Sequence, residues 1–151
     1  MGERNFRKLL EARWDEREFV CVGLDSDDEE LSASVFGKFP NPYSAVLQFN
    51  KRIVNATSDL VCAYKPNFAF YVKIGVDGLR TLQDTISYIH YVVPGVPVII
   101  DTKDADIGNT NRGYVKMLGL MGADAVTVNP YLGEEAVKPF LNETDMGVPL
   151  G

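Results

Sequence analysis

The chain has 151 residues, of which 46% are hydrophobic and 24% charged, as in an average soluble domain, so a buried core is expected and disorder of the whole chain is not. Its net charge of −6 argues against a surface for nucleic acid or for an anionic membrane, although a few local cations can still hold a phosphate. The single histidine, His90, excludes a zinc site made of clustered histidines.

Cysteine usage and hydropathy indicate a cytoplasmic protein. Cys21 and Cys62 each lie in a hydrophobic run and form no C-x-x-C pair, so we interpret them as reduced core thiols. No apolar stretch approaches the roughly 18 residues of a membrane helix. The N-terminus is charged and lacks the apolar segment of a secretory signal.

The first part of the chain predicts two strands with a helix between them. Residues 19–24 form a short apolar run that is typical of a buried strand. A polar loop follows, and we expect the acidic side chains of residues 27–30 to face solvent. Asn41 and Pro42 predict the start of a helix, with Asn41 as the N-cap, and residues 60–64 predict the second strand.

The same alternation continues to the end of the chain, because apolar residues repeat at helical spacing between short β-branched runs. The expected elements are, in order, a helix through residues 79–89, a strand at 97–100, a helix through 115–121 closed by Gly122, a strand at 124–128, a short helix at 136–141 and the start of a fifth strand at 146–151.

Strands that alternate with helices predict right-handed βαβ units and a parallel sheet, in a single domain over residues 1–151. Two α/β architectures fit this pattern, a doubly wound sheet and a (β/α)8 (TIM) barrel. A complete barrel needs about 250 residues. Four βα units are present here, so under the second architecture the domain is an incomplete barrel.

Polar residues stand at the end of every predicted strand. Asp25 ends the first, Lys65 the second, Asp101 and Lys103 the third, and Asn129 the fourth. In both architectures the carboxyl ends of the strands meet at one mouth, where active sites form. Any one charged pair there could equally be a structural ion pair. Charges at three strand ends together favour a functional site.

Asp101 and Lys103 are two residues apart on a strand, so their side chains should project from the same face. A lysine beside carboxylates stays protonated, which suits a general acid or a group that stabilises developing negative charge. It does not suit a Schiff-base nucleophile, which must be neutral.

The stretch 104–110 is too polar to be core, and we expect it to lead into a helix near Asn111. Asn109 or Thr110 could serve as the N-cap of that helix. A helix N-terminus also binds anions, so the same residues could contact a ligand. Asn67, after the second strand, could likewise touch a substrate or cap the next turn.

Four motifs resemble the orotidine 5′-phosphate decarboxylase family, in its long-loop bacterial branch. The stretch 101–110, D-T-K-D-A-D-I-G-N-T, resembles the family signature D-x-K-x-x-D-I-G-N-T. The segments 22–25 (V-G-L-D), 64–71 (Y-K-P-N-F-A-F-Y) and 124–133 (D-A-V-T-V-N-P-Y-L-G) match further motifs in the same order. The resemblance covers roughly residues 15–151 and implies a (β/α)8 barrel, of which this chain carries about the first four βα units.

The resemblance also implies an activity, the decarboxylation of orotidine 5′-phosphate to UMP in pyrimidine biosynthesis, without metal or cofactor. Lys103 would protonate C6 of the pyrimidine. Lys65, Asp101 and Asp106 would complete an alternating Lys–Asp array, and Asp25 would bind the ribose.

The resemblance further implies a homodimer, because the family's counterparts of Asp106, Ile107 and Thr110 reach into the neighbouring subunit's site. The family's phosphate-binding and pyrimidine-binding residues come from later strands, beyond Gly151.

Two other interpretations stay open. Related sugar-phosphate decarboxylases and aldolases share D-x-K-x-x-D but use Mg²⁺, held by an acid at the end of the second strand, where this chain resembles the decarboxylases in having Lys65. The chain could also be a half-barrel without catalysis, acting as an assembly module or an inactive fragment.

Overall fold

The computed structural model describes residues 4–31, 39–104, 106–142 and 147. Its elements are, in chain order, α1 (Phe6–Asp15), β1 (Val20–Leu24), α3 (Pro42–Thr57), β2 (Val61–Pro66), α4 (Phe68–Val72), α5 (Val76–Val92), β3 (Ile99–Asp104), α6 (Gly108–Leu120), β4 (Ala125–Val128), the 3-10 turn η1 (Pro130–Leu132) and α7 (Glu134–Leu141). None of the described helices is both long enough and apolar enough to cross a lipid bilayer.

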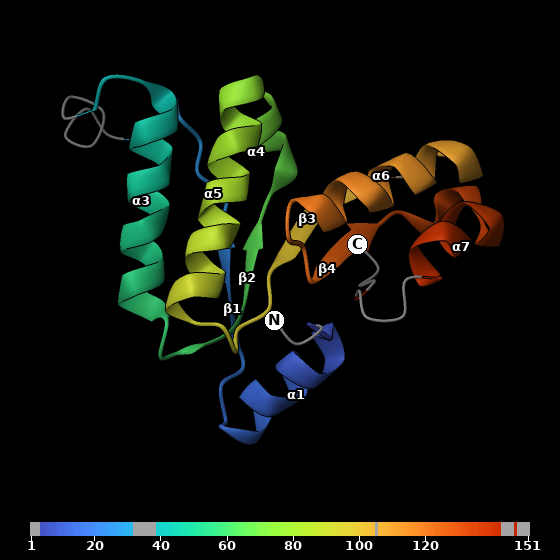
Figure 1. Ribbon diagram of the computed structural model, residues 1–151, viewed down its shortest axis with the longest axis horizontal. Helices are drawn as coiled ribbons and strands as arrows, with labels where there is room; N and C mark the ends of the chain where they lie inside the picture. Colours follow the sequence, from blue (N-terminus) through green and yellow to red (C-terminus); the bar gives the residue numbers. More distant parts are fainter. Residues whose placement is uncertain (1–3, 32–38, 105, 143–146, 148–151) are drawn as a thin grey trace.

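The strands are parallel, and their neighbours follow the order of the chain. β1 pairs with β2, and β3 pairs with β4. Two isolated parallel bridges, Tyr64 to Val98 and Asn67 to Asp101, join β2 to β3. The predicted α/β class with parallel strands is therefore confirmed. The carboxyl ends of β1, β2, β3 and β4 all lie at the same end of the molecule, the upper end in Figure 1.

A further parallel bridge places Gly147 beside Ala125 on the open side of β4, where the Gly147 amide donates to the Asp124 carbonyl over 2.9 Å. This is the position at which the sequence predicts a fifth strand to begin. The other residues of that prediction, 146 and 148–151, lie outside the described part of the chain.

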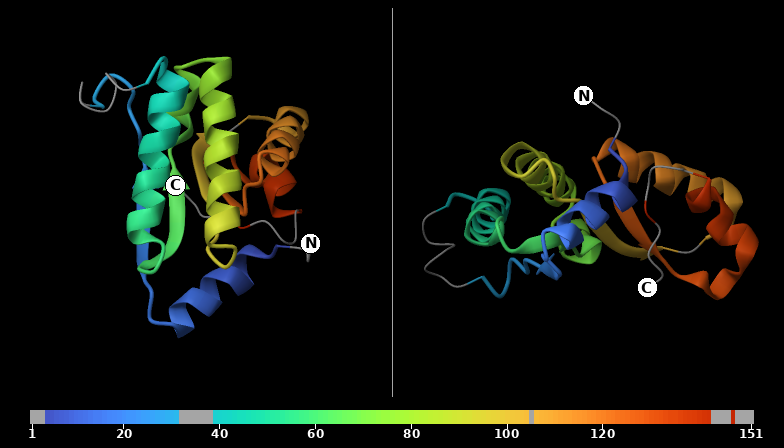
Figure 2. Two further views of the ribbon diagram at one scale, coloured as in Figure 1. Left: turned by 60° about the vertical axis from the view of Figure 1, so that its left-hand side comes forward. Right: turned by 90° about the horizontal axis from the view of Figure 1, so that it is seen from below.

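The core lies between the strands and the helices α3 and α5, which run side by side on one flank of the sheet (Figures 1 and 2). Val54 of α3, Leu82 and Ile86 of α5, and Tyr64 of β2 are at most 1% exposed. Burying one such aliphatic side chain contributes about 1.5–3 kcal/mol, so this layer is the main apolar contribution to the fold. The predicted cap of α3 is confirmed, because the Asn41 side chain accepts from the Ser44 amide over 2.9 Å.

Helix α1 crosses the end of the sheet at which the strands begin, as the view from below in Figure 2 shows. Arg4, just before α1, binds both carboxylate oxygens of Asp124, at 2.6 and 3.0 Å. His90 Nε2 lies 3.1 Å from the same carboxylate, and the Val98 amide donates to it over 2.8 Å. The single histidine, His90, thus belongs to a structural network at the end of the sheet where the strands begin, away from their carboxyl ends.

The start of α6 corrects one prediction. The helix begins at Gly108 with Ile107 as its N-cap residue, so neither Asn109 nor Thr110 caps it. The end of α6 agrees with the sequence, because Gly122 adopts a φ of +89° directly after the C-cap residue Met121. An L-residue with a side chain is strained in that left-handed conformation, which glycine adopts freely.

Candidate active site

The side chain of Asp101 is the centre of a polar cluster at the carboxyl end of β3. Lys65 at the end of β2 donates to Asp101 Oδ2 over 2.5 Å, and Lys103 donates to Asp101 Oδ1 over 2.6 Å. The hydroxyl of Thr127 on β4 donates to Asp101 Oδ1 over 2.7 Å. Three neighbouring strands therefore meet at one carboxylate, and the two lysines predicted from the strand ends are brought together by it.

The electrostatics of this cluster favour charged side chains. Burial would raise the pKa of Asp101, but hydrogen bonds from Lys103, Lys65 and Thr127, with the charge of Lys65, lower it to about 2. For Lys65 burial acts to lower the pKa, and the hydrogen bond and charge of Asp101, with the charge of Asp25, outweigh it and raise the pKa. Near neutral pH the cluster thus holds an ionised carboxylate against a protonated Lys65.

The side chain of Lys103 is 54% exposed whereas that of Asp101 is 6% exposed. The Lys103 amino group therefore lies at the surface of the site, and the carboxylate that binds it is buried. The backbone of Lys103 has a φ of +52°, in the left-handed region that β-strand residues rarely adopt. Such strain is characteristic of residues held in place for function. In this structure a hydrogen bond fixes the Lys103 backbone, because its amide donates to Thr127 Oγ1 over 3.0 Å.

Thr127 is a member of the site that the sequence prediction did not include. It is 6% exposed, it accepts from the Lys103 amide and it donates to Asp101, so one hydroxyl orients both residues. The available signal was a polar residue within an otherwise apolar buried run, at residues 125–128.

Asp25 directly follows β1, at the same end of the sheet as the cluster, and is exposed. β1 pairs with β2 so that Gly23 lies opposite Lys65 and Leu24 opposite Pro66, which brings the backbone of Asp25 beside the end of β2. The charge of Asp25 is also among the influences that raise the pKa of Lys65. Asp25 could accept hydrogen bonds from a ligand held above the two lysines.

The other three predicted residues lie apart from the cluster within this chain. Asp106 Oδ1 accepts from the Ile107 amide over 2.6 Å, and none of the hydrogen bonds in the described part of the chain joins Asp106 to Lys65 or Lys103. Ile107 is 71% exposed, and Thr110 in the first turn of α6 is exposed as well. An apolar side chain left this open suits contact with another molecule.

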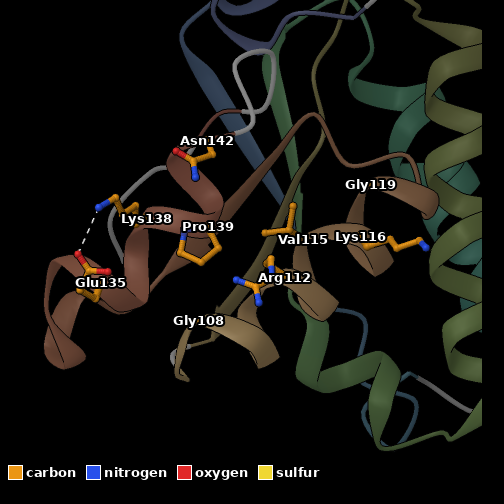
Figure 3. A pocket seen from close by; sticks show the side chains of 9 residues that line it. All are labelled: Gly108, Arg112, Val115, Lys116, Gly119, Glu135, Lys138, Pro139 and Asn142. Atoms are coloured by element: carbon orange, nitrogen blue, oxygen red, sulfur yellow. Dashed lines mark hydrogen bonds and ion pairs between the residues drawn. The ribbon is translucent and has the colours of Figure 1, made fainter.

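A separate groove of about 680 Å³ lies between α6 and α7 (Figure 3). Its lining includes the cations Arg112, Lys116 and Lys138, and Lys138 is paired with Glu135 over 3.3 Å. None of Lys65, Asp101 and Lys103 lines this groove, so it is distinct from the candidate active site.

Comparison with known proteins places most of the chain in one group. Residues 18–148 match the family model described as the orotidine 5′-phosphate decarboxylase / HUMPS family. An orotidine 5′-phosphate decarboxylase of Christiangramia forsetii is 41% identical over 140 residues, which are 92% of this chain and 50% of that protein. The corresponding enzyme of Thermomicrobium roseum is 41% identical over 146 residues, 95% of this chain and 50% of that protein.

Solved structures agree with the sequence relatives. The OMP decarboxylase of Leishmania donovani superposes with a TM-score of 0.81 at 31% identity, over 97% of this chain and 52% of that one. The UMP synthase of the same organism gives a TM-score of 0.83 at 30% identity, over 97% of this chain and 30% of that one. The chain spans about half the length of the curated relatives that it matches.

Proposed function

Since this chain belongs to the orotidine 5′-phosphate decarboxylase / HUMPS family, we propose that the protein decarboxylates orotidine 5′-phosphate to UMP and CO₂. The observation that carries this proposal is the Lys65–Asp101–Lys103 cluster, in which one buried carboxylate holds two ammonium groups at 2.5 and 2.6 Å. The activity would belong to pyrimidine biosynthesis, and the protein would act in the cytoplasm.

The proposed reaction breaks the bond between C6 of the pyrimidine and its carboxyl carbon. The electron pair stays on C6, CO₂ leaves, and Lys103 Nζ gives its proton to C6. Lys103 regains a proton from solvent, which its 54% exposed side chain can reach. An ammonium group fixed beside C6 stabilises the negative charge as it forms, without the reorganisation that water would need.

Asp101 has two roles in this scheme. Its carboxylate fixes the Lys103 ammonium group by a 2.6 Å hydrogen bond, and its charge would stand beside the substrate carboxylate, where repulsion favours the departure of CO₂. A pKa of about 2 keeps Asp101 ionised near neutral pH, so the charge is present when substrate binds.

The remaining predicted residues complete the proposal. Asp25 would hold the ribose hydroxyls from the end of β1. Asp106, Ile107 and Thr110 would reach the site of a second copy in a homodimer, a placement supported by their separation from the cluster and by the 71% exposure of Ile107.

We further propose that residues 1–151 form the first four βα units of a single (β/α)8 barrel domain. The support is the order of the strands, which runs β1, β2, β3, β4 and then Gly147 without the reversal that a doubly wound sheet requires. The half-length match to the relatives agrees with this proportion.

A Mg²⁺-dependent sugar-phosphate reaction is the enzyme alternative within this group of proteins. Mg²⁺ needs carboxylate and water oxygens in octahedral geometry. Here the Lys65 ammonium group already occupies Asp101 Oδ2 at 2.5 Å, which disfavours a metal at this place. Turnover that is abolished by EDTA and restored by Mg²⁺ would support the metal-dependent reaction and contradict our proposal.

The test is loss of orotidine 5′-phosphate absorbance with the purified native polypeptide, whose intact mass is measured in the same preparation. We expect Lys103→Ala to lower the turnover rate by about 10³-fold or more, because the substitution removes an electrostatic contact to the transition state. The matched control is Lys116→Ala, on the exposed side of α6, which should keep wild-type turnover. Retained turnover in a folded Lys103→Ala variant would overturn the assignment, and a folded wild-type protein without turnover would favour a non-catalytic module.

A further inference from the structure

A group of polar side chains lies buried directly beneath Asp25. Its members are Ser26 after β1, Asn50 of α3, Tyr71 of α4 and Thr85 of α5, and none of them is more than 4% exposed. We call these four residues the Asn50 network. No step of the proposed reaction uses any of them.

Hydrogen bonds connect the members of the Asn50 network through the Asn50 amide. Asn50 Nδ2 donates to Tyr71 Oη over 3.1 Å and to Thr85 Oγ1 over 3.0 Å, and Asn50 Oδ1 accepts from Ser26 Oγ over 2.5 Å. Tyr71 Oη in turn donates to the backbone carbonyl of Leu24 over 2.9 Å. The Asn50 network therefore holds the residue before Asp25 and the residue after it.

The free-energy cost of burying these polar side chains indicates that the Asn50 network does more than fill space in the core. Burying polar groups is unfavourable compared with apolar side chains of the same volume, unless every group finds a partner in fixed geometry. The neighbouring core between α3 and α5 is apolar, as at Val54, Leu82 and Ile86. Polar side chains from three helices meet here, beside the backbone of Leu24 and Ser26.

The same segment is held from its solvent side by Lys73, just after α4. Lys73 forms ion pairs with Asp27 and with Asp28, the latter at 2.9 Å. Asp27 belongs to the acidic run expected to face solvent, and its side chain, 21% exposed, meets Lys73 at the surface. The Asp27 amide donates to the Asp25 carbonyl over 2.9 Å, so the ion pair is coupled to Asp25 itself.

We propose that the Asn50 network positions Asp25 to bind the ribose diol of the substrate. This inference rests on the proposed function and adds positioning residues to it. Asp25 is exposed and carries the contact, and the buried network beneath it decides where the carboxylate stands relative to Lys65. Tyr71 contributes through its hydroxyl and not through its ring alone.

The test substitutes Tyr71→Phe, which removes only the hydroxyl, with Tyr64→Phe as its matched control. Tyr64 is also 0% exposed, and its hydroxyl also donates to a backbone carbonyl, that of Val54 at 3.1 Å, but within α3 and away from Asp25. We expect Tyr71→Phe to raise KM for orotidine 5′-phosphate by about five- to tenfold with little change in kcat, the result of losing binding that substrate and transition state share. Tyr64→Phe should lower the melting temperature similarly and leave KM unchanged.

A second readout does not depend on turnover. Amide hydrogen exchange at Asp27 and Glu29 should accelerate in Tyr71→Phe, because the backbone beside them loses its anchor, and should match wild type in Tyr64→Phe. Ser26→Ala removes a different bond of the Asn50 network and should act in the same direction as Tyr71→Phe.

The two readouts separate the two ideas. Equal changes of KM and of exchange in Tyr71→Phe and Tyr64→Phe would overturn the positioning role. If the wild-type protein does not turn over orotidine 5′-phosphate, the proposed function fails, and the exchange rates alone still decide whether the Asn50 network holds the Asp25 segment.

Discussion

At the residue scale, one carboxylate organises the candidate site. Asp101 accepts from two ammonium groups and from Thr127, which satisfies both of its oxygens although the side chain is only 6% exposed. A buried carboxylate without these donors would be strongly unfavourable. Removing Asp101 would therefore disturb both Lys65 and Lys103.

This arrangement predicts a pH dependence of stability. The Asp101 pKa of about 2 in the folded protein lies below its unfolded value of about 3.9. Because the folded pKa is depressed, the stabilisation is complete above about pH 4 and disappears as the pH falls through the folded pKa; its size is on the order of 2 kcal/mol. Urea unfolding of wild type and Asp101→Asn should give a difference that shrinks between about pH 4 and pH 2. A difference that stays constant over that range would contradict the prediction.

At the element scale, the segment between β3 and α6 depends on helix α7 for its position. Asn111 of α6 is fully buried, and its side-chain amide donates to the carbonyl of Asp106 over 2.5 Å and to that of Ala136 over 2.6 Å. One side chain thus ties the residues proposed to reach a second copy to the first turns of α7. Helices α6 and α7 pack against each other on the far flank from α3 and α5 (Figure 1).

We therefore expect Asn111→Ala to lower the free energy of unfolding by about 1–3 kcal/mol, because a buried carbonyl group and a partly buried one lose this donor. The control is Asn109→Ala on the exposed side of the same helix, which should cost less than about 0.5 kcal/mol. Chemical denaturation of both variants measures the difference. Equal losses of stability would show that the buried amide is not the tie between α6 and α7.

At the scale of the whole molecule, apolar surface is open where β1 and β2 begin. The prediction that the first strand is buried is therefore wrong, since β1 is mostly exposed and Cys21 is not a core thiol. Phe19, Val20 and Leu60 are 67%, 56% and 53% exposed, and among the described strands β1 has a hydrogen-bonded neighbour on one side only. An unpaired edge beside exposed apolar side chains is a template for association. In the proposed barrel this edge would be covered by the last strand.

A polypeptide of residues 1–151 is accordingly expected to self-associate, and Val20→Lys should reduce that association because a charge opposes pairing at a strand edge. Sedimentation velocity over a range of concentrations provides the measurement. Val76→Lys is the control, since Val76 is 68% exposed at the start of α5 and far along the chain from the β1 edge. A similar effect of both substitutions would exclude the β1 edge as the contact.

The sequence alone determined the features that depend on neighbours along the chain. Periodicity separated strands from helices, the cap at Asn41 and the positive φ at Gly122 followed from local turn chemistry, and charges after the strands marked the mouth of the sheet. The motif around Lys103 was also recognised from the sequence alone, because its residues lie close together along the chain.

Only the tertiary structure decided which distant groups meet. Thr127 joins Asp101, Lys73 pairs with Asp27 and Asn50 reaches Ser26, and each pair is separated by more than twenty residues. No local pattern encodes such partners, because a buried polar side chain is satisfied by whatever element packs against it. The sequence therefore predicted which charged residues follow the strands, and the packing of the strands and helices decided which partners hold those residues in place.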